Sequence, residues 1–598
     1  MKPLPSTFKR SSVLTLVLLV LVTASVLFLI WNRFTKPSPN CDGEFDLVIA
    51  GAEIIDGSGR PSFSGDLGIR ERRIACIGDL HEAKTRSVID ATGLTVAPGF
   101  IDVHTHIERN VPQTGGFLAP NFVRQGVTTV ITGNCGRSVL ELGKFFRRIE
   151  TNGSQVNVAS LVGHNSIRSH VMKQRSAAPS QAEMAELEKL VETAMRDGAI
   201  GISTGLVYVP GTFAKSDEIS RLARIVAHEN GLYVSHLRDE GSKGREALEE
   251  AISIGQQTGV AVHISHFKAQ GPNEWGSAEE RLNLVRAAND RGVIVSLDQY
   301  PYRASSTGLA VLLPSWVSEG DFASAKRKLL DPATRKRVRN EMLVQLKRNG
   351  WQDYAFARIA YYQFDQSLVG LNIAEITQKR AGRTLSGRTS IIRSAFTGAD
   401  VARANKDDEL GRQAETIMDL FSHGGAQMVF FDMSEDDVEI IMKDPQVMFG
   451  SDSSVREENP AVLPHPRGMG TFPRILGVYA REKGLFTLEE AIRRMTWLPA
   501  KTFGLKGRGL IEENNWADLV IFDRNRILDT ATFEKPFSFP VGVEYVIVNG
   551  SLVLDHHQFS KSLPGNAIRR ELPTPSDPSD WRRMESPLPS PLQAKGNE

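Results

Sequence analysis

The sequence contains few cysteines and almost no net charge. Cys41, Cys76 and Cys135 are its three cysteines in 598 residues, and no two of them form a CxxC pair. Three cysteines cannot build a disulfide framework, which excludes a small protein held together by disulfides. The chain has 71 basic and 70 acidic residues, and a net charge of +1 gives no support for nucleic-acid binding.

Internal repeats of solenoid length are also absent from the sequence. The chain is too long for a single compact domain of ordinary size. A barrel enlarged by insertions could nevertheless use most of its 598 residues.

One long uncharged hydrophobic run is present, near the amino terminus. It extends from Val13 to Trp31, which is long enough to cross a bilayer as a helix. We therefore predict a single-pass membrane anchor over residues 1–36. Lys and Arg before the run favour a cytoplasmic amino terminus and an extracytoplasmic catalytic domain. The alternative is a signal peptide cleaved near Ala24, which would leave a secreted or periplasmic protein.

Short β-branched segments bracket a long central region. They begin with FDLVIAGAEIIDGSG at Phe45, and similar segments return as ADLVIFD and EYVIVNGSLVL near the carboxyl terminus. This pattern predicts a small β-sandwich formed from both chain ends, residues 37–98 and 501–570. Residues 571–598 are rich in Pro and Ser and are predicted to be disordered.

The central region, residues 99–500, alternates between apolar strands and amphipathic helices. Eight β-branched runs occur between GFIDVHTH and VMFGSD, with helical stretches between several of them. Such alternation is typical of parallel βα units, so the fold class is α/β. We expect a (β/α)8 TIM barrel, although an open sheet in two domains fits the same pattern. Residues from about 303–446 are charged and helical in pattern, and we interpret them as an insertion over the barrel mouth.

Residues that can bind metals stand near the ends of the predicted strands. His104 and His106 follow the first strand, and their period-two spacing places both side chains on one face. Later strand ends add four more candidates: Cys135, His236, His266 and Asp452. Each of these residues alone fits ordinary packing, but barrel enzymes build their active sites at the carboxyl ends of strands. Together they indicate a metal site, whereas we interpret His164 as a supporting or structural residue.

Several motifs resemble those of metal-dependent amidohydrolases, and among them the N-acyl-D-amino-acid deacylases, or D-aminoacylases. In chain order these motifs are PGFIDVHTH, GNCG, SHLRDEG, HISHFKAQG, DQYPYRASST, GSD and HPRGMGTFPR. The resemblance covers roughly residues 45–570. The HxH motif is weakly specific, whereas the cysteine of GNCG separates this family from dihydroorotase-like relatives, which use a carboxylated lysine.

The resemblance implies a zinc enzyme with one or two ions per subunit. One metal position would lie among His104, His106 and Asp452. The other, tighter position would be held by three residues: Cys135, His236 and His266. A thiolate combined with imidazoles suits zinc, and Cys135 could bridge both positions. Asp452 would take a proton from the attacking water and transfer it to the leaving amine.

The resemblance also implies how an N-acyl-D-amino acid would be bound. Its α-carboxylate would contact four residues: Lys268, Tyr300, Ser306 and Arg467. TGLAVLLPSW, which begins at Thr307, has no basic residue, so we expect a neutral or apolar D-side chain. Ser453 stands where the family often has Gly, and this difference bears on substrate choice.

Two of the cysteines bear on the compartment of the protein. We interpret Cys41 as a plain surface cysteine, and in an oxidising compartment Cys135 would need its metal to stay out of a disulfide.

Other functions are also compatible with the sequence. A hydrolase of cyclic amides, of N-acyl-D-Glu or N-acyl-D-Asp, or of D-dipeptides is an alternative on the same scaffold. A non-catalytic membrane-anchored barrel protein is another, although all six candidate ligands are present. The sequence leaves the oligomeric state open.

Overall fold

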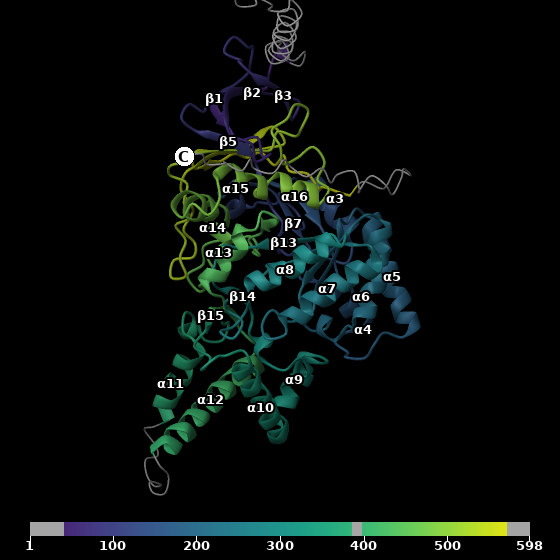
Figure 1. The fold of residues 1–598 in the computed structure, drawn as a ribbon, viewed down its shortest axis with the longest axis vertical. Coiled ribbons are helices and arrows are strands. Elements are labelled where there is room, and N and C mark those ends of the chain that lie inside the picture. Colours follow the sequence, from purple (N-terminus) through teal and green to yellow (C-terminus); the bar gives the residue numbers. More distant parts are fainter. Residues whose placement is uncertain (1–40, 385–397, 571–598) are drawn as a thin grey trace, which may run out of the picture.

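The computed structural model describes residues 41–384 and 398–570 (Figure 1). The predicted membrane anchor and the predicted disordered tail both lie outside these ranges. Within them, no helix combines the length and the apolar character that a membrane span requires. The anchor therefore stays a prediction.

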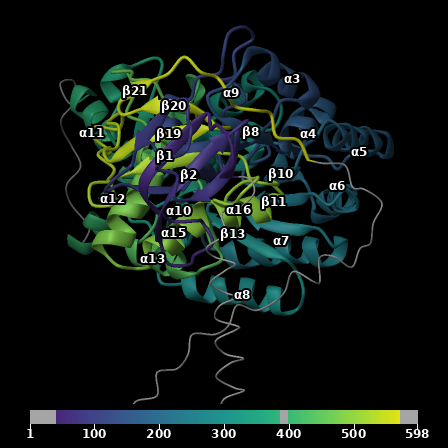
Figure 2. The same ribbon diagram turned by 90° about the horizontal axis from the view of Figure 1, so that it is seen from above.

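A nine-stranded sheet contains strands from both ends of the described chain. Its order is β21-β20-β19-β18-β5-β1-β2-β3, and β4 pairs with β1. The strands are β1 (Leu47–Ile54), β2 (Phe63–Arg70), β3 (Arg73–Gly78), β4 (Val88–Asp90), β5 (Thr95–Pro98), β18 (Leu519–Phe522), β19 (Val543–Val548), β20 (Ser551–Asp555) and β21 (Gln558–Phe559). Antiparallel pairing of β5 with β18 joins the two parts, which lie together in Figure 2. Buried Ile49, Ile69, Leu519 and Ile547 share one core, so apolar burial holds the two chain ends together.

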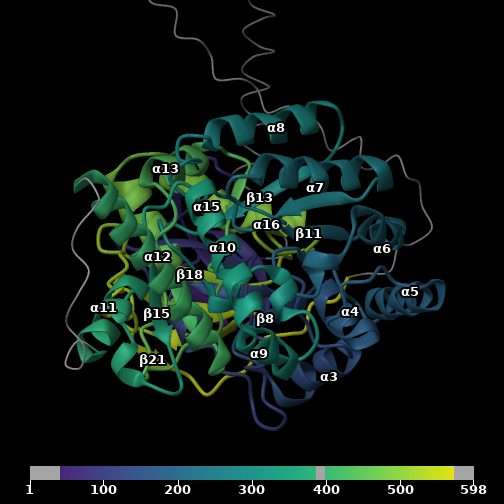
Figure 3. The same ribbon diagram turned by 90° about the horizontal axis from the view of Figure 1, so that it is seen from below.

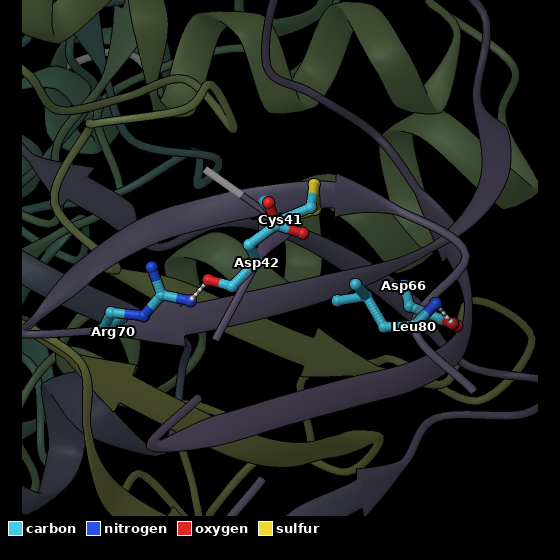
Figure 4. Close-up of a disulfide and its surroundings, with 6 residues drawn as sticks. Cys41, Asp42, Asp66, Arg70 and Leu80 are labelled. Carbon is cyan, nitrogen blue, oxygen red and sulfur yellow. Dashed lines mark hydrogen bonds between the residues drawn. A yellow bond between two sulfur atoms is a disulfide. The ribbon is translucent and has the colours of Figure 1, made fainter. Parts of the chain in front are cut away.

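Cys41 and Cys76 form a disulfide beside this sheet (Figure 4). Their Cα atoms lie 5.0 Å apart, and 35 residues separate them in sequence. Arg70 Nη2 donates a 2.6 Å hydrogen bond to the carbonyl of Asp42 and helps to hold this segment against β2. The expectation of a plain surface cysteine at position 41 is wrong, because the pairing of β1, β2 and β3 brings a distant cysteine to it.

The central strands are parallel and form two sheets. The smaller sheet contains β6 (Phe100–Asp102), β7 (Val127–Thr132) and β8 (Asn157–Ser160). The larger contains, in spatial order, β9 (Val162–Gly163), β10 (Gly201–Gly205), β11 (Leu232–His236), β12 (Ala261–Ile264), β13 (Val295–Gln299) and β17 (Val447–Phe449). Leu161 alone separates β8 from β9, and a parallel bridge joins Thr105, after β6, to Ser453, after β17. The predicted α/β fold class is confirmed.

Amphipathic helices lie outside these strands (Figure 3). They are α3 (Leu142–Asn152), α4 (His164–Met172), α5 (Gln181–Arg196), α6 (Ser216–His228), α7 (Gly244–Thr258), α8 (Ala278–Asp290) and α13 (Glu435–Lys443). In α5, the buried residues Met184, Leu187 and Val191 recur at helical spacing on one face. Ser180 and Glu183 form a capping box that defines where this helix begins.

An insertion with its own core lies between β13 and β17. Its antiparallel sheet has the order β14 (Ser305–Gly308), β16 (Gln427–Phe430), β15 (Ala357–Tyr361). Its helices are the short 3-10 helices η3 (Leu309–Leu312), η4 (Ser315–Ser318) and η5 (Gln366–Leu368) and the α-helices α9 (Phe322–Leu330), α10 (Pro332–Arg348), α11 (Ile373–Thr384) and α12 (Gly398–Ser422). The labelled α-helices lie at the lower end of Figure 1. Val338, Ile359 and Met428 belong to its separate core. After the insertion, α13 packs against α8 of the central region.

Candidate metal centre and active site

All six expected metal ligands lie at the carboxyl ends of parallel strands. His236 is the last residue of β11, and the others follow their strands closely: His104 and His106 after β6, Cys135 after β7, His266 after β12 and Asp452 after β17. Since parallel strands end on the same side of a sheet, residues far apart in sequence meet there. The six side chains form two groups, and within each group the ligand atoms lie within 4.8 Å of one another.

The first group contains His104, His106, Cys135 and Asp452. His106 Nε2 lies 3.0 Å from Asp452 Oδ1, and His104 Nε2 lies 3.3 Å from Cys135 Sγ. His104 Nε2 is also 3.6 Å from Asp452 Oδ1. Nitrogen, sulfur and oxygen donors therefore converge on one small volume.

The second group contains Cys135, His236 and His266. Cys135 Sγ lies 3.5 Å from His236 Nδ1 and 3.6 Å from His266 Nε2. Two ligands of a tetrahedral zinc ion, each about 2.0–2.3 Å from it, are roughly 3.5 Å apart, so this donor set fits such an ion. Cys135 is buried, is not part of the disulfide, and belongs to both groups, which places its sulfur where it could bridge two positions.

Three of these residues adopt a backbone conformation that residues other than glycine seldom adopt. The φ angle is +52° at Cys135, +37° at His266 and +48° at Asp452. A left-handed conformation costs about 1–3 kcal/mol for such residues and persists only where the surrounding structure holds it. Strain of this kind is concentrated at functional sites, and here it falls on candidate ligands from three different strands.

Neighbouring charges keep Cys135 and Asp452 ionised. Burial would raise the pKa of the Cys135 thiol, but the adjacent His104 ring holds that pKa well below its ordinary value. Burial would also raise the pKa of Asp452, yet Arg467 and His104 hold it well below the usual range for a carboxyl group. Both groups therefore carry the negative charge that favours binding of a cation.

A buried carboxylate, Asp298, supports the histidine ligands from behind. Its Oδ2 lies 3.4 Å from His104 Nδ1 and 2.8 Å from His263 Nε2. Its Oδ1 accepts a 2.9 Å hydrogen bond from the backbone N–H of His266. A carboxylate on the outer nitrogen of a ligand histidine fixes the orientation of the ring. Asp298 therefore positions ligands from two strands.

Glu240 plays the same part on the other side of the centre. Its Oε1 lies 2.9 Å from His266 Nδ1 and accepts a 2.7 Å hydrogen bond from Lys268 Nζ. Burial would raise the pKa of Glu240, but Lys268 and His266 hold it far below its ordinary value. Glu240 therefore stays charged and anchors both side chains.

The four residues expected to bind a substrate carboxylate lie around the same centre. Arg467 Nη1 forms a 2.8 Å ion pair with Asp452 Oδ2, and its guanidinium lies 4.7 Å from the centre of the Tyr300 ring. Lys268 is paired with Glu240, and Ser306 Oγ donates to the carbonyl of Met428 at 2.7 Å. The hydroxyl of Tyr300 is buried and has no hydrogen-bond partner within the described ranges. Tyr300 therefore has a donor to offer to a ligand.

A pocket with an empty volume of about 1100 Å³, its open mouth included, adjoins this centre. One part of its lining is polar and contains His236, His266, Lys268, Tyr300 and Asp452. Another part comes from the insertion and includes Leu312, Met342, Leu346, Trp351, Phe356 and Phe430. Among the residues that the structure describes, no lining residue between Val311 and Phe430 carries a charge. The pocket thus joins a polar, metal-binding part to a neutral and largely apolar one.

A comparison with known families agrees with this geometry. The model of the amidohydrolase family matches residues 87–554, which include all six candidate ligands. This chain belongs to the amidohydrolase family.

Two deacylases match this amidohydrolase over nearly their whole length. A D-aminoacylase of Alcaligenes xylosoxydans xylosoxydans is 36% identical over 549 residues, covering 88% of this chain and 98% of that protein. An N-acyl-D-glutamate deacylase of the same organism is 33% identical, covering 88% and 97%. The resemblance to D-aminoacylases is confirmed by these matches.

Solved structures agree with them. The N-acyl-D-glutamate deacylase of Bordetella bronchiseptica, solved with zinc and a phosphonate that mimics the tetrahedral intermediate, has a TM-score of 0.70 and 32% identity. It covers 88% of this chain, and this chain covers all of it. A D-aminoacylase described with a binuclear metal centre has a TM-score of 0.69, also at 32% identity and the same coverage.

The sequence does not predict two of the acids of this amidohydrolase that position ligands. Asp298 opens the quoted DQYPYRASST motif, and Glu240 follows His236 by four residues in SHLRDEG. Both acids stand in recognisable motifs, but a positioning acid has no spacing rule that distinguishes it from an ordinary polar residue. His164, in contrast, lies outside both ligand groups and pairs with Glu218 at 2.9 Å, in agreement with a structural role.

Proposed function

We propose that this amidohydrolase hydrolyses the amide bond of N-acyl-D-amino acids, which releases a D-amino acid and a carboxylate. The observation that carries the proposal is the buried thiolate Cys135, shared between two ligand groups and next to Asp452. A D-aminoacylase and an N-acyl-D-glutamate deacylase match almost their full length to this chain, which supports the same reaction class.

Zinc is the metal that this donor set fits. Thiolate, imidazole and carboxylate ligands at the observed separations suit zinc, and the sharing of Cys135 supports a capacity for one or two ions. When bound, zinc supplies a Lewis acid for the amide carbonyl and lets water act as a nucleophile near neutral pH. His104, His106, Cys135, His236, His266 and Asp452 would hold it.

Asp452 is the proposed general base and acid. Its carboxylate belongs to the first ligand group and also lines the pocket. Because the carboxylate is ionised, it can accept a proton from water. The same oxygen would then deliver the proton to the nitrogen of the leaving D-amino acid. Asp452 is the carboxylate of the first ligand group, whereas Glu240, which also lines the pocket, is already paired with His266 and Lys268.

The α-carboxylate of the substrate would bind beside Lys268, Tyr300, Ser306 and Arg467. Tyr300 offers its hydroxyl, and Arg467 offers a buried guanidinium that already neutralises one carboxylate. The uncharged wall of the insertion favours a neutral or apolar D-side chain, because a buried acidic side chain would require a cation. Ser453 donates to the carbonyl of Ser454, so its hydroxyl is directed at the local backbone.

We also infer the wider setting of the enzyme. The bridge between Thr105 and Ser453 supports a closed (β/α)8 barrel, and the sheet shared by both chain ends supports the expected β-sandwich. A disulfide between Cys41 and Cys76 favours an oxidising compartment, in accord with an extracytoplasmic catalytic domain on a single membrane anchor.

Matched N-acetyl-D- and N-acetyl-L-amino acids test the proposal, together with metal analysis of the purified full chain. We expect zinc to copurify and the D-enantiomers of methionine and leucine to be hydrolysed. Equal turnover of both enantiomers, or turnover of cyclic amides alone, would contradict the proposed reaction. Faster turnover of N-acetyl-D-glutamate than of N-acetyl-D-methionine would contradict the proposed side-chain preference.

A further inference from the structure

The helix pair α9–α10 of the insertion concentrates positive charge. Residues 322–348, which span both helices, contain nine Lys or Arg residues and two Asp or Glu residues, in a chain whose net charge is +1. The two helices pack against each other and lie at the lower end of the molecule in Figure 1. Arg335 is neutralised by Glu415 and Asp419 of α12, and the remaining excess creates a positive field that the composition of the whole chain conceals.

The exposed face of α9 mixes a cation with large apolar side chains. Phe322, Lys326 and Leu330 recur every four residues, so they form one row along the helix. Phe322 is 49% exposed and Leu330 is 69% exposed. Ala325 and Leu329 occupy the neighbouring, buried face and hold the helix in the insertion core.

The exposed face of α10 repeats this mixture. Lys336 and Arg337 are exposed, and Val344, two helical turns later on the same face, is 66% exposed. Val338 and Met342 are buried on the other side. Large exposed apolar side chains beside cations on two neighbouring helices differ from the isolated apolar residues common on soluble surfaces.

Few carboxylates neutralise this face. Arg337 pairs with Glu341 at 2.8 Å, and both side chains are substantially exposed, so the pair is weak. Lys326 and Lys336 have no carboxylate within ion-pair distance in the ranges 41–384 and 398–570. Their charge is therefore available to an external anion.

We propose that the exposed face of α9–α10, formed by Phe322, Lys326, Leu330, Lys336, Arg337 and Val344, docks on an anionic lipid bilayer. This bilayer is a second one, distinct from that of the predicted anchor, because α9–α10 and β1–β3 lie at opposite ends of the molecule (Figure 1). The cations would contact headgroup phosphates, and the apolar side chains would enter the boundary between headgroups and acyl chains. The apolar side chains favour a bilayer over a nucleic acid, whose phosphates would be met by cations alone. The proposal is independent of the reaction proposed above.

Docking at this face would bring the pocket close to the bilayer. The side of α10 that carries Met342, Gln345 and Leu346 lines the pocket, so one helix, about 10 Å across, separates the pocket from the docking face.

The test uses the full chain in nanodiscs of phosphatidylcholine, which would accommodate the anchor predicted over residues 1–36. An environment-sensitive fluorophore on Val344→Cys reports entry into lipid when vesicles are added. The emission is expected to shift to the blue with vesicles of equal phosphatidylglycerol and phosphatidylcholine, and to stay unchanged with phosphatidylcholine alone. The same fluorophore on Val88→Cys, an exposed position in the nine-stranded sheet, is the control and is expected to show no shift.

Charge reversal tests the source of the binding. Lys326→Glu and Lys336→Glu are each expected to weaken vesicle affinity at least about fivefold, whereas Lys561→Glu, at an exposed position in the carboxyl-terminal part, leaves it unchanged. Equal shifts with both vesicle types, a shift at Val88→Cys, or unchanged affinity in the two reversals would each overturn the proposal. A shift caused by single-stranded DNA but not by anionic vesicles would overturn it in favour of nucleic-acid binding.

Discussion

Arg467 Nη1 lies 2.8 Å from Asp452 Oδ2 in a largely buried ion pair, while the other oxygen of Asp452 lies 3.0 Å from His106 Nε2. Asp452 thus joins the metal-binding group to a cation expected to bind the substrate. A bound substrate carboxylate would compete with Asp452 for Arg467. Because Arg467 lowers the pKa of Asp452, that competition would raise the pKa toward the value a general base needs.

Asp452→Asn should abolish most of the activity and leave metal at the Cys135, His236 and His266 group. The amide cannot accept the proton, and loss of a general base typically costs about 10²–10⁴ in kcat. Steady-state kinetics and plasma mass spectrometry measure the two effects. Full turnover with unchanged zinc content in this variant would refute the role of Asp452.

His266→Ala should lose metal and activity together. His266 supplies one of three donors in its group, and no other histidine in the described ranges replaces it there. Zinc content and kcat are expected to fall in parallel, and treatment of the wild type with a chelator should give the same loss. His228→Ala, at an exposed residue on α6, is the matched control. Zinc bound at full stoichiometry in His266→Ala would contradict the assignment.

Glu218→Gln should destabilise the fold in a pH-dependent way. Glu218 accepts hydrogen bonds from buried His164 and Arg168 at 2.9 and 3.0 Å, which outweigh burial and lower its pKa. A lowered folded-state pKa gives stability that is present above the unfolded value of about 4.3 and is lost as the pH falls through the folded value. At neutral pH the variant should lose about 3 kcal/mol.

Urea unfolding at neutral and at acidic pH measures this effect. The difference between wild type and Glu218→Gln should shrink as the pH falls below about 4. Glu192→Gln, at an exposed position of α5, is expected to match the wild type. An equal difference at both pH values would show that the charge of Glu218 is not the cause.

Cys76→Ser should lower stability without lowering activity. The disulfide closes a segment of 35 residues, and its loss is expected to cost about 3–4 kcal/mol. The metal ligands come from other strands, so zinc content and kcat should be retained. Thermal unfolding with and without a reductant measures the change, and Cys41→Ser should behave identically. A reductant that leaves the wild-type midpoint unchanged would contradict this role.

Leu312→Arg should shift substrate preference toward acidic D-side chains. Leu312 lines the uncharged part of the pocket, and a guanidinium there could bind a side-chain carboxylate. A charge-assisted hydrogen bond contributes about 1.5–3 kcal/mol, so the ratio of kcat/KM for N-acetyl-D-glutamate to that for N-acetyl-D-methionine should rise at least tenfold. Leu312→Met is the matched control, and an unchanged ratio in Leu312→Arg would place the side-chain site elsewhere.

The candidate ligands can be predicted from the sequence because their positions follow simple rules. His104 and His106 share a face through period-two alternation, and each later ligand closes an apolar run that is recognisable as a strand. The disulfide could not be predicted from the sequence, because 35 residues separate Cys41 from Cys76. The pairing of β1, β2 and β3 brings the two cysteines together.

Local pattern was sufficient for the α/β class, the candidate ligands and the neutral character of the segment after Thr307, since periodicity and residue type depend on neighbours in the chain. Tertiary structure decided which side chains meet. It set Asp298 behind His104, paired Lys268 with Glu240 and Arg467 with Asp452, and placed the insertion over the pocket. These contacts join residues from separate strands and loops. Which residues meet depends on distances that only the packed chain defines.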